Sequence, residues 1–171
     1  MTDTMTREQR SRCMAAIKGK DTKPEMIVRK YLFSRGLRFR IQVRKLPGKP
    51  DIVLPKYKTV IFVNGCFWHG HEGCKYFRLP KSNVEFWAEK IEHNVARDVR
   101  NEAELKSLGW RVFRVWECEI KTALQRDEFL KRLYDCIVNS AQSYLIEPAM
   151  DEQSIAAEPE SEHIYGDNNH S

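Results

Sequence analysis

One twelve-residue stretch, VNGCFWHGHEGC at residues 63–74, constrains the fold of this chain more than any other. It contains two Cys, two His, a Phe and a Trp. Thiolates and imidazoles are good ligands for Zn²⁺, which favours four of them in a tetrahedron. Cys66, His71 and Cys74 are spaced five and three residues apart, so a tight loop can fold around one ion. The stretch therefore predicts a zinc-bound loop.

The fourth ligand must come from elsewhere in the chain. Cys118 directly follows WRVFRVW, which is typical of a strand, so the edge of a sheet would bring its thiol to the loop. His69 also lies close by, which leaves five candidates for four positions in a closed structural site. If His71 faces the metal, His69 is free to act as a general base, because histidine exchanges protons near neutral pH. The alternative to metal binding and catalysis is that the cysteines are small core residues and the histidines are surface residues. Cys13 and Cys136 are isolated in the sequence, and we expect inert thiols.

Charge is distributed unevenly along the 171 residues. All 29 Lys and Arg precede residue 146, together with 17 of the 24 acidic residues, so residues 1–145 carry a net charge of about +12. A body this basic indicates a polyanionic partner such as nucleic acid, although many basic proteins have none. Residues 146–171 hold seven acidic residues and little apolar periodicity, so we expect one folded domain over 1–145 and a disordered acidic tail over 146–171.

The chain shows no run of eighteen apolar residues and no apolar N-terminal segment, so we expect neither a membrane span nor a secretory signal. We therefore expect a cytoplasmic protein.

Periodicity predicts eight elements in the order α, α, β, β, β, α, β, α. A mixed sheet flanked by helices, an α/β fold, follows from this order, and the last strand enters after a helical crossover that favours parallel pairing. Thr22 is the expected N-cap of the second helix, Glu25 stands in capping-box position, and Gly36 and Gly109 are expected to end two helices. The expected helices are residues 6–18, 21–35, 83–108 and 128–141, and the expected strands, of which the first three form a β-meander, are 37–43, 51–54, 59–63 and 110–116.

Two carboxylates are candidates for a second metal site. Asp51 opens a strand after PGKP, and the next strand ends beside the cysteine-rich loop, while Glu25 lies on the preceding helix. Mg²⁺ prefers oxygen ligands, and it activates water for attack on phosphate. The alternatives are a turn residue for Asp51 and a helix cap for Glu25.

Aromatic residues accompany these groups. Phe67 and Trp68 lie in the loop, and Trp87 and Phe86 lie near the start of the long helix. Aromatic rings stack on bases, and apolar wedges unstack a base step most easily where pairing is already weak. Core packing is the alternative for each ring, and we expect it for Phe86.

Four stretches resemble the very short patch repair (Vsr) DNA mismatch endonucleases: SRCMAAIKGKDTKPE, LPGKPDIVLPKYKTVIFVNGCFWHGHEGC, EFWAEKIEHNVARD and LGWRVFRVWECE. They cover residues 10–120 approximately. The resemblance implies a type II restriction-endonuclease-like fold and a strand-specific nick 5′ to the T of a T:G mismatch, which arises when 5-methylcytosine deaminates. It also implies two Mg²⁺ ions, a structural Zn²⁺, double-stranded DNA as substrate, and cooperation with mismatch-repair proteins. A bacterial protein that associates with the nucleoid when it is bound to DNA is implied as well. A mismatch has no two-fold symmetry, so we expect a monomer.

The resemblance also implies roles for individual residues. Asp51 and the main-chain carbonyl of Val63 would hold Mg²⁺, His69 would activate water with support from Glu25, and Asp98 would orient metal-bound water or His69. The implied zinc ligands are Cys66, His71, Cys74 and Cys118. The implied DNA-contacting residues are Phe67, Trp68 and Trp87 from the major groove, Met14 and Ile17 from the minor groove, and Lys90 and Asn94 at the mismatched pair.

This chain departs from the family pattern at Asn64, where some members carry His. An amide orients water or a phosphate oxygen but takes no proton at neutral pH, so Asn64 cannot perform the proton transfer that a His could perform at that position. A restriction-type endonuclease that cuts undamaged sites and a zinc-stabilised DNA-binding module without catalysis remain the alternative functions. The first would need no aromatic wedge, and the second leaves Asp51, Glu25 and His69 together unexplained.

Overall fold

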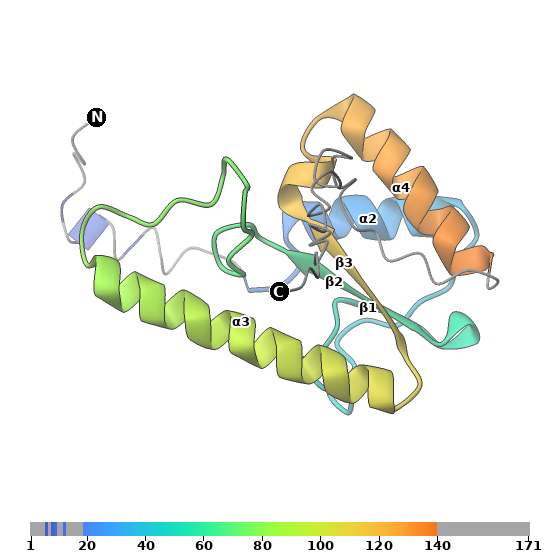
Figure 1. The fold of residues 1–171 in the computed structure, drawn as a ribbon. Helices are drawn as coiled ribbons and strands as arrows, with labels where there is room; N and C mark the ends of the chain where they lie inside the picture. Colours follow the sequence, from blue (N-terminus) through green and yellow to red (C-terminus); the bar gives the residue numbers. More distant parts are fainter. Residues whose placement is uncertain (1–5, 7, 10–11, 13–18, 140–171) are drawn as a thin grey trace, which may run out of the picture.

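The computed structural model describes residues 6, 8, 9, 12 and 19–139 (Figure 1). Within these residues, no helix is long and apolar enough to cross a membrane. Residues 8, 9 and 12 are helical, and Thr6 and Gln9 bond each other's main-chain N–H through their side chains. Cys13, Met14, Ile17 and the tail lie outside the described residues. The elements are helices α2 (Lys23–Ser34), α3 (Val84–Ser107) and α4 (Ala123–Val138), strands β1 (Ile52–Leu54), β2 (Thr59–Asn64) and β3 (Arg111–Trp116), and short 3₁₀ turns η1 (Pro55–Tyr57) and η2 (Glu117–Ile120).

The three strands form a mixed sheet in the order β1-β2-β3. Strands β1 and β2 pair antiparallel with Val53 opposite Val60, and β2 and β3 pair parallel with Val60 opposite Val112. The helix α3 provides the crossover between the two parallel strands, which confirms the expected parallel entry of the last strand.

Helices cover both faces of this sheet, with α2 and α4 on one side and α3 on the other (Figure 1). Alternate residues of each strand point to opposite faces, so the sheet supports two apolar clusters. One packs Ile52, Ile61 and Val115 against α2 and α4, and the other packs Val53 and Val60 against Leu105 of α3. The predicted α/β fold with a helix-flanked mixed sheet is therefore confirmed.

The helix α2 begins and ends where the sequence predicts. The Thr22 hydroxyl accepts a hydrogen bond from the Glu25 main-chain N–H at 3.4 Å, and Gly36 adopts a φ of +83° after the C-cap. Residues with a side chain rarely adopt this left-handed conformation, so Gly36 allows the chain to leave the helix. The predicted end of α3 at Gly109, with φ of +78°, is confirmed in the same way.

Two predicted elements differ from the structure. Residues 37–43 do not form a strand: only Arg40 bridges to Val53, because Gln42 has a φ of +53° that breaks the extended chain. The expected three-stranded meander is thus a hairpin with one bridge. Helix α4 begins at Ala123 instead of residue 128, and the Thr122 hydroxyl donates to Gln125 Oε1 at 2.8 Å at this start. Apolar periodicity misses the first turn because Leu124 is 83% exposed.

Candidate active site and metal-binding loop

A cleft of about 910 Å³ opens where the start of α2, the edge of β1 and β2, and the middle of α3 meet. Seven of the predicted site residues line it, and they come from segments that are far apart in the sequence. They are Glu25, Asp51, Val63, Asn64, Trp68, His69 and Asp98. The structure thus brings the predicted carboxylates, the free histidine and one aromatic residue to one place.

Asp51 lies directly before β1 and is held at several points. Its main-chain N–H donates to Ile61 O at 3.1 Å, and its carboxylate Oδ2 accepts a hydrogen bond from the Val63 N–H at 2.7 Å. Burial raises the pKa of this carboxyl to about 6, and the nearby Glu25 carboxylate adds to the increase, while the Val63 hydrogen bond opposes it. No Lys or Arg side chain in the described part of the chain forms an ion pair with this carboxylate. Asp51 is therefore a desolvated carboxylate, and the charges of Arg29 and His69 offset the effect of its burial only in part.

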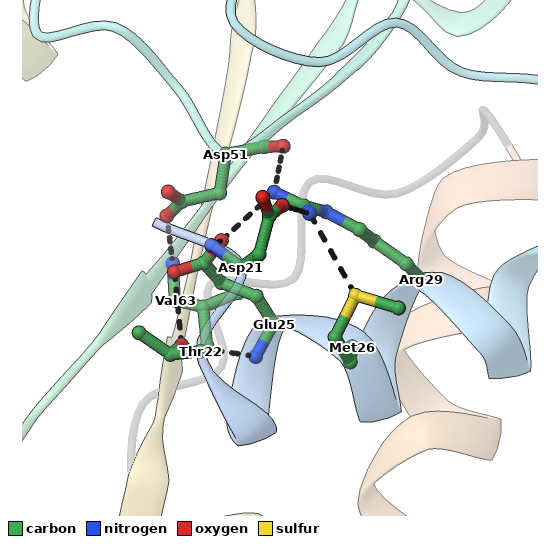
Figure 2. A network of polar contacts seen from close by, with 7 residues as sticks. All are labelled: Asp21, Thr22, Glu25, Met26, Arg29, Asp51 and Val63. Carbon is green, nitrogen blue, oxygen red and sulfur yellow. Dashed lines mark hydrogen bonds and ion pairs between the residues drawn. The ribbon is translucent and has the colours of Figure 1, made fainter. Parts of the chain in front are cut away.

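Glu25 lies at the first turn of α2 in a dense polar network (Figure 2). Its Oε1 accepts from the Thr22 hydroxyl at 2.9 Å, and its Oε2 accepts from the Asp21 N–H at 3.0 Å and from Arg29 Nη2 at 2.8 Å. The carboxylate is only 6% exposed. Glu25 thus takes part in the capping of α2 and also lines the cleft, and the sequence allows both. Its hydrogen bonds fix its orientation relative to α2.

His69 is oriented by Asp98 of α3. The Nδ1 atom of His69 lies 2.5 Å from Asp98 Oδ2, and both side chains are partly buried, with 26% and 20% exposure. When Nδ1 carries the proton and donates it to the carboxylate, Nε2 is left as the acceptor. The structure thus places Asp98, and not Glu25, in hydrogen-bond contact with His69.

The four predicted zinc ligands lie close together, outside the cleft lining. The ligand atoms of Cys66, His71, Cys74 and Cys118 all lie within 4.8 Å of one another, a separation that fits a tetrahedral Zn²⁺. Burial lowers the pKa of His71, with a further contribution from the charge of Arg114, and this favours the neutral imidazole that binds metal. The His71 ring also stacks on Trp116, with centroids 4.0 Å apart. The cluster could therefore hold zinc.

The two histidines of the loop serve different places. His69 lines the cleft, whereas none of the four clustered residues does. His71 Nδ1 lies 3.4 Å from Cys118 Sγ, which ties the loop to the 3₁₀ turn after β3. The separation expected from sequence, with one imidazole in the cluster and its neighbour outside it, is the arrangement observed.

The loop's aromatic residues form a cluster with helix α3. The rings of Phe67, Trp68 and Trp87 meet edge to face, with centroid distances of 5.2, 5.5 and 5.9 Å. All three are partly exposed. The prediction that Phe86 is a core residue is wrong: it is 56% exposed and touches the edge of Trp87, because this end of α3 extends beyond the sheet.

Contacts to α3 hold the loop in place. Asn94 Nδ2 donates to the Trp68 carbonyl at 3.0 Å, while Lys90 is exposed one turn earlier. Gly70 has a φ of +59°, and a Cβ there would lie 3.0 Å from Val95 Cγ2, so this close approach requires glycine. One N–H of the Asn94 amide, a group expected at the mismatched pair, is thus bonded to the loop itself.

Sequence reasoning missed one residue of the site, Arg29, which links Glu25 to Asp21 and to the Asp51 carbonyl. The only sequence signal was its position four residues after Glu25 on the same helix face. Arg97 and Arg114 also line the cleft, where they form ion pairs with Asp98 at 3.6 Å and with Glu102 at 2.6 Å.

A basic α/β protein with a carboxylate, a carboxylate-oriented histidine and aromatic rings around one cleft has the features of a nuclease. The family model described as DNA mismatch endonuclease Vsr matches residues 2–75. The chain belongs to this family, since the DNA mismatch endonuclease Vsr of Escherichia coli (strain K12) is 42% identical over 149 residues, which cover 86% of this chain and 95% of that protein. It is therefore an endonuclease of the Vsr type that acts on DNA.

Other similar proteins are described as nicking enzymes. The Type II nicking enzyme V.NmeAIP of Neisseria meningitidis serogroup A is 52% identical over 133 residues, covering 78% of this chain and 94% of its own. The Type II nicking enzyme V.XorIIP of Xanthomonas oryzae pv. oryzae is 47% identical over 135 residues, covering 79% and 98%. Among solved structures, the catalytic domain of the homing endonuclease I-Bth0305I matches 71% of this chain and 100% of that domain, with a TM-score of 0.46 and 21% identity, which is too distant to support a functional conclusion.

Proposed function

We propose that this chain is a Mg²⁺-dependent endonuclease that nicks one strand of double-stranded DNA 5′ to the T of a T:G mismatch. One observation carries the proposal: Trp68 and His69 are consecutive residues that line the same cleft as Asp51. An aromatic wedge that opens a base step would therefore bring a neighbouring phosphodiester to the carboxylate and the imidazole. The E. coli relative described as a DNA mismatch endonuclease supports the choice of substrate.

Asp51 and Val63 fit a magnesium site. Within a strand the N–H and C=O of one residue point to the same side, and the Val63 N–H points to the Asp51 carboxylate. The Val63 carbonyl is therefore directed to the same side, beyond the end of β1. A buried carboxylate with a raised pKa gains from a cation. We propose two Mg²⁺ ions bound here, which would activate the attacking water and stabilise the leaving oxygen.

The protein groups around this site have distinct proposed tasks. His69, held by Asp98 through Nδ1, presents Nε2 to accept the proton of the attacking water. Asn64 is 5% exposed at the end of β2, and its amide would orient a water or a phosphate oxygen without titrating. The cysteine-rich cluster holds a structural Zn²⁺ that fixes the loop bearing Trp68 and His69.

A nicking assay tests the substrate and the metal together. Duplexes with T:G, U:G and matched pairs, each with and without Mg²⁺, should show Mg²⁺-dependent cleavage of one strand at T:G and none at matched pairs. Asp51→Ala should abolish nicking. Normal nicking by this variant, or equal cleavage of matched DNA, would contradict the proposal.

Replacement of Trp68 by Ala separates mismatch recognition from restriction-type cleavage. Base–aromatic stacking contributes about 1–3 kcal/mol per base, so the Kd for T:G duplex should rise roughly 5- to 150-fold. Binding to matched duplex should change little. An unchanged Kd for T:G would favour a restriction-type enzyme, and mismatch binding without any cleavage in Mg²⁺ would favour a DNA-binding module.

A further inference from the structure

We propose that Arg29 is a positioning residue of this site, which fixes the Glu25 carboxylate and the main chain of Asp51 in one arrangement. The inference rests on the proposed function for its kinetic consequences, but the arrangement itself can be tested without substrate. Arg29 would act through its partners and would not touch DNA, because its side chain is only 9% exposed.

The guanidinium connects three segments of the chain (Figure 2). Nη1 lies 2.5 Å from Asp21 Oδ1, directly before α2, and Nη2 donates to Glu25 Oε2 at 2.8 Å within α2. Nη2 also donates to the Asp51 carbonyl at 3.3 Å, across 22 residues of sequence. A planar fork with several fixed donors can make these contacts together, whereas the ammonium of Lys is a point charge on a flexible stem.

The main chain and the side chain of Asp51 are consequently held by different elements. Arg29 of α2 binds its main-chain carbonyl, and the Val63 N–H of β2 binds its carboxylate. Since α2 and β1 are otherwise joined by a long connection without regular structure, the guanidinium provides a direct polar link between Glu25 and Asp51. Its loss should allow the start of α2 to shift relative to the first strand.

Folding alone explains this residue poorly. Arg29 Nε is buried and has no hydrogen-bond partner within the described part of the chain. A buried polar group without a partner reduces stability, and an apolar side chain at this position would avoid that cost. The buried cation instead stands among Asp21, Glu25 and Asp51, three acidic residues that would otherwise repel one another.

The test compares Arg29→Lys with Arg111→Lys. Arg111 is the matched control, because its guanidinium donates to the Ile137 and Cys136 carbonyls at the end of α4, far from the cleft. Both variants lose a partly or fully buried guanidinium, and both keep the positive charge. Arg29→Gln is the second variant, since its amide can still bond Glu25 four residues earlier but is too short to reach the Asp51 carbonyl.

Two readouts are measured in the zinc-loaded protein. Amide hydrogen exchange at Val63, whose N–H is bonded to Asp51, should rise about 10-fold or more in both Arg29 variants, while exchange at Val60, near the other end of β2, stays unchanged. In steady-state nicking of T:G duplex at saturating Mg²⁺, kcat should fall roughly 10- to 100-fold with KM within about 2-fold. Arg111→Lys should change neither Val63 exchange nor kcat.

Unchanged Val63 exchange in both Arg29 variants would overturn the proposal, as would an equal rise at Val60, because the residue would then serve only global stability. A fall in kcat that Arg111→Lys reproduces would overturn it as well. If the wild-type protein fails to nick T:G duplex, the proposed function fails, and the exchange data still decide the role of Arg29.

Discussion

Replacement of Asp51 by Asn should make the protein more stable in the absence of Mg²⁺. The carboxyl has an ordinary pKa of 3.8 and a pKa of about 6 in the folded protein, mainly because it is buried. The folded state therefore disfavours the ionised form. The two pKa values, 3.8 and about 6, differ by roughly two units, and each unit corresponds to about 1.36 kcal/mol. Above pH 6 the ionised Asp51 therefore lowers the free energy of unfolding by about 3 kcal/mol.

The sign and the pH dependence follow from the same values. The folded pKa is the higher one, so the cost is fully present above about pH 6 and disappears as the pH falls below 3.8. Near pH 7.5 the variant should gain up to about 3 kcal/mol, and near pH 5 about half as much. The introduced amide can still accept the Val63 hydrogen bond through its oxygen, so this contact is preserved.

Urea denaturation of the zinc-loaded protein at both pH values, without Mg²⁺, measures this difference. Mg²⁺ should then stabilise the wild type and leave the variant unchanged, because a ligand stabilises the state that binds it. A variant that is less stable than the wild type, or a stability difference that is equal at the two pH values, would refute the reasoning. Zinc content must remain the same in all samples.

Two further replacements test the zinc cluster and the histidine pair. Cys118→Ser should lose stoichiometric zinc, measured by atomic absorption. It should also lower the free energy of unfolding by several kcal/mol, since structural zinc contributes directly to folding. Retained zinc would show that another residue completes the site. Asp98→Asn should keep the fold and reduce kcat about 100-fold, because it removes the carboxylate that orients His69; an undiminished kcat in single-turnover nicking would remove His69 as the proposed base.

Capping residues in the sequence predicted the ends of the helices that carry site residues. Thr22, Gly36 and Gly109 act within a few residues of their own position, so the bounds of α2 and the end of α3 followed from their chemistry. The clustering of the four predicted zinc ligands was predictable because three of them lie within nine residues of sequence. The parallel pairing of β3 followed from a general rule of handed crossovers.

Other features depend on contacts that the sequence does not display. Gln42 interrupts an otherwise alternating apolar pattern through its left-handed backbone conformation, which such a pattern cannot reveal. Phe86 looks like a core residue by type, but it lies on the part of α3 that extends past the sheet. Arg29 bonds to a main-chain carbonyl 22 residues away, and only the packing of α2 beside β1 brings the two together.

The alternation of residues in the loop would link the proposed metal binding to the proposed chemistry. His69 and His71 are two residues apart, yet the first is held by Asp98 of α3 and the second lies against Cys118. Trp68 is fixed by Asn94 of the same helix through its carbonyl. A change in the zinc cluster should therefore alter both the aromatic cluster and the imidazole, because the loop joins them through one or two peptide bonds. Loss of zinc is expected to weaken mismatch binding and catalysis together, whereas loss of the Asp98 carboxylate is expected to affect catalysis alone.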